Sequence, residues 1–329
     1  MPASLFPLNE FWWFYVAFTA LVLVLLAADL GLFHRRAHAV GFREAVIWTC
    51  VWAALALVFC LGIYQYASWR FGGVQGKQVA LEFLTGYIVE ESLSLDNMFV
   101  FVLVFQHFGI PARHHHRVLF YGILGALLFR GIFIALGSAL LQYAWAVIVF
   151  GVFLILTGIR MMLAPAREMQ PEESLLVRLL RKFMPVTPGL QESRFFVRIG
   201  GTLHATPLLL TLAVVEASDI LFAIDSVPAI FAITQEPLIV YTSNIFAILG
   251  LRSMYFLLAG AVERFHLLRH GLALILIFVG LKMSWLNQYW EGHFPIGISL
   301  AVIGGIIGAS IGLSLAFPKK ALQRAGSRD

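Results

Sequence analysis

The chain has 329 residues, of which 60% are hydrophobic and only 12% are charged. Soluble domains are about 45–50% apolar and about 25% charged, so this chain has too few polar groups to cover a globular surface. Its outer surface must face lipid, which excludes the soluble classes of protein. The net charge of +5 does not indicate a nucleic-acid partner, because Lys and Arg lie in short loops beside apolar segments rather than on one face of a domain.

Apolar segments long enough to cross a membrane recur along the chain. A spanning helix needs about 20 predominantly apolar residues, and nine segments qualify, at approximately 11–33, 45–66, 79–106, 117–140, 143–163, 206–233, 238–261, 268–288 and 294–316. We therefore predict an all-α fold, a polytopic transmembrane helix bundle that forms a single domain over residues 1–329. The first segment lacks the charged start and cleavage site of a signal peptide, so it is interpreted as a transmembrane helix.

The basic residues indicate the orientation of these segments. Alternating the ends of nine spans places on one side the loops 34–44, 107–116, 164–205 and 262–267 and the tail from 317. With boundary residues assigned to the nearer loop, that side carries 18 of the 23 Lys and Arg, the opposite side two, and the spans three. Because cytoplasmic loops are rich in Lys and Arg, we predict an outside N-terminus and a cytoplasmic C-terminus.

The longest predicted loop, 164–205, is expected to be cytoplasmic. From Pro171 to Lys182 its acids come first and its bases last, as the helix dipole favours. We expect a short amphipathic helix at the membrane surface there, and a small hairpin around Gly200 and Gly201.

Acidic side chains within membrane spans are costly and by default indicate a functional site. Six of them lie in the middle of the third and sixth spans: Glu90, Glu91, Asp96, Glu216, Asp219 and Asp225. Only Arg130 and Arg252 lie comparably deep. Two arginines cannot neutralise six carboxylates, so protons or metal cations must supply the remaining positive charge.

The third and sixth spans also share a pattern of polar residues. The same spacing occurs at Glu90, Asp96 and Asn97 and at Asp219, Asp225 and Ser226. The third span runs inward and the sixth outward, so the match indicates an inverted repeat with a site at the repeat interface near mid-membrane. Antiparallel helices then place Glu90 level with Asp225 and Asp96 level with Asp219. Pro228 is expected to break the sixth helix and to free backbone carbonyls.

The chemistry of these side chains favours a hard divalent cation. Carboxylate, amide and hydroxyl oxygens suit Mg²⁺, Ca²⁺ and Mn²⁺, and no His or Cys lies deep in either acidic helix to suit Zn²⁺ or copper. The predicted metal ligands are Glu90, Asp96, Asn97, Glu216, Asp219, Asp225 and Ser226. Ion-pairing or proton-path roles are assigned to Asp29, Arg130 and Arg252. The run His114–His116 is interpreted as a solvated basic face rather than as a pH or metal sensor.

Several strings resemble the signature of the TerC family of membrane proteins, most closely its Alx type. They are Glu90-x-Ser-Leu-x-x-Asp96-Asn97, Glu216-x-x-Asp219, Phe-Ala-x-Asp225-Ser-x-Pro228-Ala, Asn244-x-Phe-Ala-Ile-Leu-Gly-Leu-Arg252 and Ala28-Asp29-Leu30. The resemblance implies a Mn²⁺ exporter of the bacterial inner membrane in which the acids of the third and sixth spans are required. The residues by themselves indicate a divalent cation carrier; manganese and the direction of transport come from the resemblance.

The leading hypothesis is a secondary transporter with alternating access, and not an enzyme. No nucleotide-binding P-loop is present, so an ion gradient is the expected energy source, with protons as the coupling ion. The expected partners are the lipid bilayer and the cation, with Mn²⁺ as transported substrate and no cofactor. The alternative is a membrane scaffold or assembly factor that holds a structural ion without transport. An intramembrane aspartyl protease is disfavoured because the Gly-x-Gly-Asp string of such enzymes is absent.

Overall fold

A computed structural model of the chain describes residues 4–28, 41–140, 143–163, 178, 182, 184–191, 194–259, 267–286 and 294–317. Within its helices, side chains are not described for Leu95, Asp96, Phe99, Ala144, Asp225, Ala259, Leu268 and Arg269. The helices are α1 (Leu8–Ala28), α2 (Phe42–Phe71), α3 (Gly73–His107), α4 (Ala112–Leu140), α5 (Ala144–Leu163), α7 (Pro207–Phe231), α8 (Pro237–Ala259), α9 (Leu268–Leu281), the π-helical turn η4 (Lys282–Leu286) and α11 (Ile296–Ala316).

The all-α membrane fold is confirmed. Within the described residues, seven helices are long and apolar enough to cross a membrane, namely α1, α2, α4, α5, α7, α8 and α11. Of the nine predicted spans, the other two correspond to α3, which carries the acids, and to the shorter apolar stretch His270–Leu286 of α9 and η4. The helix bounds lie within a few residues of most predicted boundaries.

The outer surface of the bundle is apolar, as a lipid-facing surface must be. Large hydrophobic side chains are exposed on the faces of the helices that point away from the bundle, among them Trp12, Val24, Leu61, Leu128, Leu156 and Leu315. By contrast α8 is buried along nearly its whole length. This helix carries Thr242, Ser243, Asn244 and Arg252, which protein neighbours rather than lipid must accommodate.

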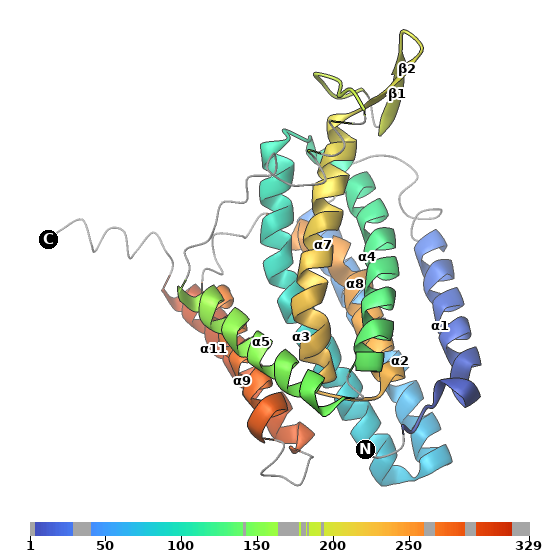
Figure 1. The fold of residues 1–329 in the computed structure, drawn as a ribbon, viewed down its shortest axis with the longest axis vertical. Helices are drawn as coiled ribbons and strands as arrows, with labels where there is room; N and C mark the ends of the chain where they lie inside the picture. Colours follow the sequence, from blue (N-terminus) through green and yellow to red (C-terminus); the bar gives the residue numbers. More distant parts are fainter. Residues whose placement is uncertain are drawn as a thin grey trace, which may run out of the picture.

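Four helices stand side by side at the centre of the molecule: α3, α4, α7 and α8 (Figure 1). The antiparallel hairpin β1 (Phe196–Ile199) and β2 (Thr202–Ala205) extends from the end where α7 begins, here called the hairpin end. The opposite end, where α1 begins, is called the N-terminal end. The hairpin prediction is confirmed: its turn uses Gly200 and Gly201, whose φ angles of 58° and 84° suit glycine.

The central packing has the symmetry that an inverted repeat requires. If α3, α4 and α5 are exchanged with α7, α8 and α9, the contact of α3 with α8 becomes that of α7 with α4, and both contacts are extensive. Under the same exchange, the contact of α3 with α7 and the contact of α5 with α9 each map onto themselves. Neighbouring side chains show that α3 runs opposite to α7, because Gly86 lies by Ile230 while Phe101 lies by Val215.

A pair of glycines marks the centre of this symmetry. Glu90 and Asp219 are 129 residues apart (219 − 90), and so are Gly151 and Gly280 (280 − 151). A Cβ at Gly280 would lie 2.6 Å from the Gly151 carbonyl oxygen, and one at Gly151 would lie 3.0 Å from the Gly280 carbonyl oxygen. Helices α5 and α9 therefore cross backbone against backbone at equivalent positions of the two repeats.

The predicted break of the sixth span is wrong: α7 continues through Pro228 to Phe231, because Pro228 lies near the end of the helix and its carbonyl still accepts the N–H of Ala232 at 3.0 Å. Proline removes only its own N–H donor, that is, the bond to Ile224. The predicted amphipathic helix in 164–205 lies almost entirely outside the described residues.

Candidate ion-binding site

A buried arginine joins the two repeats at the centre of the bundle. Arg130 on α4 is 0% exposed and forms an ion pair with Glu90 of α3, which is also 0% exposed. Its Nη1 donates to Asn244 Oδ1 of α8 at 3.2 Å and lies 3.4 Å from Ser226 Oγ of α7. Asn244 Nδ2 in turn donates to Glu90 Oε2 at 3.1 Å. All four central helices therefore contribute to one buried polar network.

The acids of α7 lie beyond this network and are less well paired. Asp219 is 3% exposed and is close enough to Arg130 and to Glu216 for direct electrostatic interaction. Nevertheless Asp219 Oδ1 and Glu216 Oε2 are buried without a hydrogen-bond partner among the described residues. Because an unpartnered carboxylate oxygen in a protein interior carries a large desolvation cost, these atoms call for a cation or a proton.

A glycine on α4 leaves room for the carboxylate of Glu216. A Cβ at Gly125 would overlap the carboxyl group of Glu216, so any larger residue there would displace this carboxylate. One turn earlier, a Cβ at Gly122 would lie 3.2 Å from Val215 Cγ1. The Glu216 side chain therefore packs directly against the α4 backbone.

Two buried polar side chains of α3 also have atoms without a hydrogen-bond partner. Asn97 is 4% exposed and Ser94 is 1% exposed, and Asn97 Nδ2 and Ser94 Oγ find no hydrogen-bond partner within the described part of the chain. From the contact of Gly86 with Ile230, four residues along each helix bring Glu90 level with Ser226, and ten bring Asp96 level with Ile220. The backbone register thus follows the predicted pairing of Glu90 with Asp225 and of Asp96 with Asp219.

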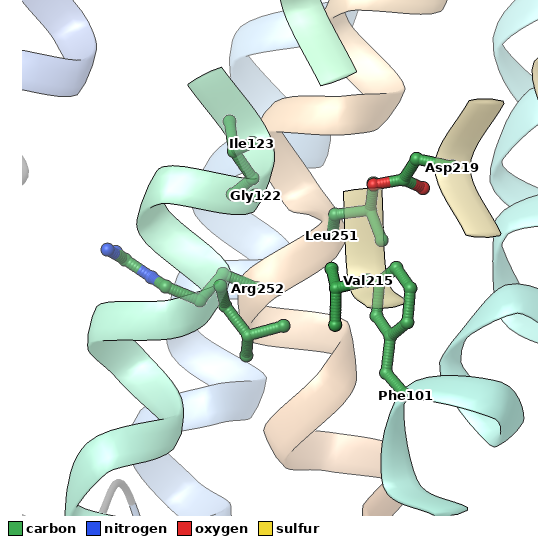
Figure 2. A pocket seen from close by; sticks show the side chains of 8 residues that line it. Phe101, Gly122, Ile123, Val215, Asp219, Leu251 and Arg252 are labelled. Atoms are coloured by element: carbon green, nitrogen blue, oxygen red, sulfur yellow. The ribbon is translucent and has the colours of Figure 1, made fainter. Parts of the chain in front are cut away.

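A small cavity adjoins Asp219 on the hairpin side of the network. Its volume is about 10 Å³, close to the smallest space that holds one water molecule. Phe101, Leu119, Gly122, Ile123, Val215, Leu251 and Arg252 complete its lining. Figure 2 shows the Asp219 carboxylate beside the cavity, whereas the Arg252 guanidinium points away from it. Arg252 Nη1 lies 3.1 Å from His116 Nε2.

Comparison with known proteins identifies the group to which this arrangement belongs. The profile of the integral membrane protein TerC family matches residues 75–322, which include α4, α7, α8 and all but the first two residues of α3. The chain belongs to the TerC family. An uncharacterized membrane protein of Myxococcus xanthus, STKORF319, is 52% identical over 302 residues, covering 92% of this chain and 91% of the relative. The putative membrane-bound redox modulator Alx of Escherichia coli K12 is 48% identical over 292 residues, covering 88% and 90%.

The expected TerC membership and likeness to Alx are thereby confirmed. A membrane protein of Rickettsia felis is also similar, with 41% identity over 289 residues that cover 88% of this chain and 92% of the relative. No solved structure matches the chain.

The structure describes the side chains of five of the predicted metal ligands but not those of the other two. Glu90, Asn97, Glu216, Asp219 and Ser226 are brought to the centre. The backbone of Asp96 and Asp225 lies in α3 and α7, but their side chains are outside the described residues, and so is all of Asp29. Among the side chains that are described, no three of His, Cys, Asp or Glu gather closely enough to hold a metal ion.

Glu91 and the histidines at the start of α4 lie apart from this centre. Glu91 faces α8, where its carboxylate is 3.3 Å from the position of a Cβ on Gly250. The interpretation of the histidines as a solvated face is wrong: His114 is 7% exposed, and His115 bonds Ile110 O at 2.7 Å and Tyr255 Oη at 2.9 Å. The start of α4 packs these rings against α3 and α8, which hydropathy does not reveal.

Three TerC residues at the centre or near it escaped the sequence reasoning. Asn244 was noted only as part of a family string, although an amide in an apolar span is itself a signal. Glu82, a further buried acid of α3, stood near the assumed start of its span. Gly125 gave no signal, because glycine is common in transmembrane helices.

Proposed function

We propose that this TerC-family chain is a secondary transporter that exports a divalent metal cation, with Mn²⁺ as the cargo, across the plasma membrane of a bacterium. The observation that carries the proposal is the pair of buried, unpartnered oxygens on Asp219 and Glu216 in the middle of the bundle. Arg130 is already engaged by Glu90. A charged group at membrane depth is retained only where it serves an ion path or has a partner.

The ligand set supports a hard cation. Oxygens of Asn97, Ser226 and the carboxylates are the donors that Mn²⁺, Mg²⁺ and Ca²⁺ prefer. Asp96 would add a carboxylate level with Asp219, and Asp225 would add one level with Glu90. The chain is proposed to hold the metal as transported substrate, with no cofactor and no enzymatic reaction.

The position of Arg130 supports an order of events. Its pairing with Glu90 neutralises one carboxylate of the layer nearer the N-terminal end, while the unpartnered oxygens of Asp219 and Glu216 lie nearer the hairpin end. The Lys and Arg distribution predicts that the hairpin end is cytoplasmic. A cation entering from the cytoplasm would therefore meet unpaired carboxylates first, as an exporter requires. Protons taken up by these carboxylates when the cation leaves would couple transport to a proton gradient.

Flux through the protein alone tests the proposal. We expect purified protein in proteoliposomes to move Mn²⁺, to respond to an imposed proton gradient, and to lose this activity in Asp219→Asn, which keeps the size but removes the charge. The alternative, a scaffold that holds a structural ion, predicts that Mn²⁺ binds without crossing. If correctly oriented, folded protein moves no Mn²⁺, the transporter proposal is wrong.

The name of the Alx relatives suggests a second possibility, a redox role. A dithiol mechanism has no support in this chain, because its two cysteines, Cys50 and Cys60, lie on the same helix, α2. The rise between them along that helix is roughly 15 Å, beyond the reach of a disulfide. A metal exporter would still alter redox enzymes that depend on the exported metal, so the two descriptions are compatible.

A further inference from the structure

A cation and an unpartnered carboxylate oxygen belong to the same small cavity on the hairpin side of the network. The cavity, of about 10 Å³, is lined by Asp219 of α7 and by Arg252 of α8. Asp219 Oδ1 is buried without a hydrogen-bond partner among the described residues, and Arg252 is 5% exposed. Opposite charges attract strongly in a protein interior. The Arg252 guanidinium nevertheless points away from Asp219 (Figure 2).

A histidine on α4 binds the guanidinium in this direction. Arg252 Nη1 lies 3.1 Å from His116 Nε2. Because arginine can only donate hydrogen bonds, Nε2 of His116 must be the acceptor, so the imidazole is neutral and carries its proton on Nδ1. His116 lies three residues before Leu119, a residue that lines the cavity, and therefore on the same side of α4.

Neighbouring contacts fix the position of this histidine. Tyr255 Oη of α8 lies 2.9 Å from His115 Nδ1, and the His115 ring stacks on Phe105 of α3 with ring centroids 4.0 Å apart. Arg252 and Tyr255 are three residues apart on α8, so they share a face and reach two consecutive histidines. The start of α4 is thus attached to α3 and α8, and the acceptor for Arg252 is held by contacts that do not involve Asp219.

A purely structural role explains this arrangement poorly. A buried carboxylate oxygen without a hydrogen bond carries a large desolvation cost, so Arg252 would stabilise the fold more as the partner of Asp219 than as that of a neutral imidazole. Its bond to His116 leaves the oxygen open. The cavity beside that oxygen is close to the size of one water molecule, which is also enough for a bare divalent cation.

We propose that Arg252 competes with the divalent cation for Asp219, and that His116 is the positioning residue that holds Arg252 aside in the state that accepts the cation. The inference rests on the proposed function, because it takes Asp219 as a cation ligand. When the cation has left, the guanidinium turns into the cavity and neutralises Asp219, while Glu216 stays available for a proton. A new cation from the cytoplasm displaces the guanidinium, which returns to His116.

Mn²⁺ binding to the purified protein tests the role of His116. The free Mn²⁺ in each sample is measured from its electron paramagnetic resonance signal. Without an acceptor for Arg252, His116→Leu should bind Mn²⁺ at least about tenfold more weakly than the parent, the usual effect of a group that orients a metal site. His116→Gln keeps an oxygen that can accept from the guanidinium, so its affinity should stay near that of the parent. Equal affinities of His116→Leu and His116→Gln would overturn the role of His116.

Removal of the competitor distinguishes this role from a structural one. His116→Leu/Arg252→Gln should bind Mn²⁺ about as tightly as the parent, since no guanidinium remains to occupy the cavity. If His116 only supported the fold, a second substitution would not restore the affinity, and a double variant as weak as His116→Leu would overturn the proposal. If His116→Leu does not fold, as judged by thermal unfolding, His116→Ala takes its place in both comparisons.

This outcome is separable from that of the proposed function. Mn²⁺ flux in the parent with a Mn²⁺ affinity that depends on neither His116 nor Arg252 would overturn only the present inference. Mn²⁺ binding that shows the expected pattern in these variants, in a protein without flux, would overturn only the transport proposal.

Discussion

Replacing Gly125 by alanine tests whether Glu216 is held in place as a cation ligand. The new Cβ would overlap the carboxyl group of Glu216. Ordinary contact requires about 3.5 Å between such atoms, so the carboxylate must move by more than about 1 Å. Oxygen ligands of hard divalent cations lie within about 2.0–2.6 Å of the metal. A displacement of this size removes Glu216 from any ligand shell that it occupies in the present arrangement.

The expected loss can be scaled from known metal sites. Removing a group that merely orients a ligand typically lowers metal affinity 10–100-fold, so misplacing the ligand itself should cost at least about 1.4–2.8 kcal/mol. Folding stability should not fall in parallel, since alanine is favoured over glycine in helices by about 1 kcal/mol. Gly125→Ala should therefore raise the half-saturating Mn²⁺ concentration at least tenfold without lowering the amount of folded protein.

The matched control lies on the same helix. Gly131→Ala introduces the same methyl group where no atom of another helix lies within 4 Å, so it should leave transport unchanged. The assay is Mn²⁺ flux into proteoliposomes as a function of concentration, with the thermal unfolding of each purified variant measured in parallel. If Gly125→Ala and Gly131→Ala give the same half-saturation, Glu216 is not a ligand positioned by α4, and the reasoning from this contact fails.

Three other predictions use the same protein. Asp96→Asn and Asp225→Asn should each abolish tolerance of excess Mn²⁺ in cells while membrane levels stay near normal, and normal export by both would disprove their assignment as ligands. Arg130→Gln should lower the amount of folded protein, because an unpaired buried charge costs about 3–5 kcal/mol, whereas Arg130→Gln/Glu90→Gln should recover much of it; the melting temperatures decide. A reporter active only in the periplasm should be silent when fused at the C-terminus, and a cytoplasmic one active, or the nine-span orientation is wrong.

The sequence by itself determined the membrane fold and where the acids lie in it. Lipid offers no hydrogen bonds, so every spanning segment must be helical and predominantly apolar, and helices such as α2 and α11 are therefore readable from composition alone. The same constraint makes Asp219 conspicuous, because a carboxylate in such a segment is too costly to be incidental. The repeated spacing of Glu90 and Asp219 also carried over into the packing, where α3 and α7 lie side by side in opposite directions.

Only the tertiary structure decided which groups meet. From the sequence, Arg130 and Arg252 were equally good candidates for the counter-ion of the acids. In the structure Arg130 forms an ion pair with Glu90, whereas Arg252 contacts His116. The hydrogen bond from Thr234 to Glu82, 152 positions apart, was equally unforeseen. Such contacts depend on how each helix is rotated about its axis and shifted along it relative to helices distant in the chain. Hydropathy is nearly blind to both quantities, because helices such as α3 and α8 have no single apolar face. The packing of side chains sets the rotation and the shift.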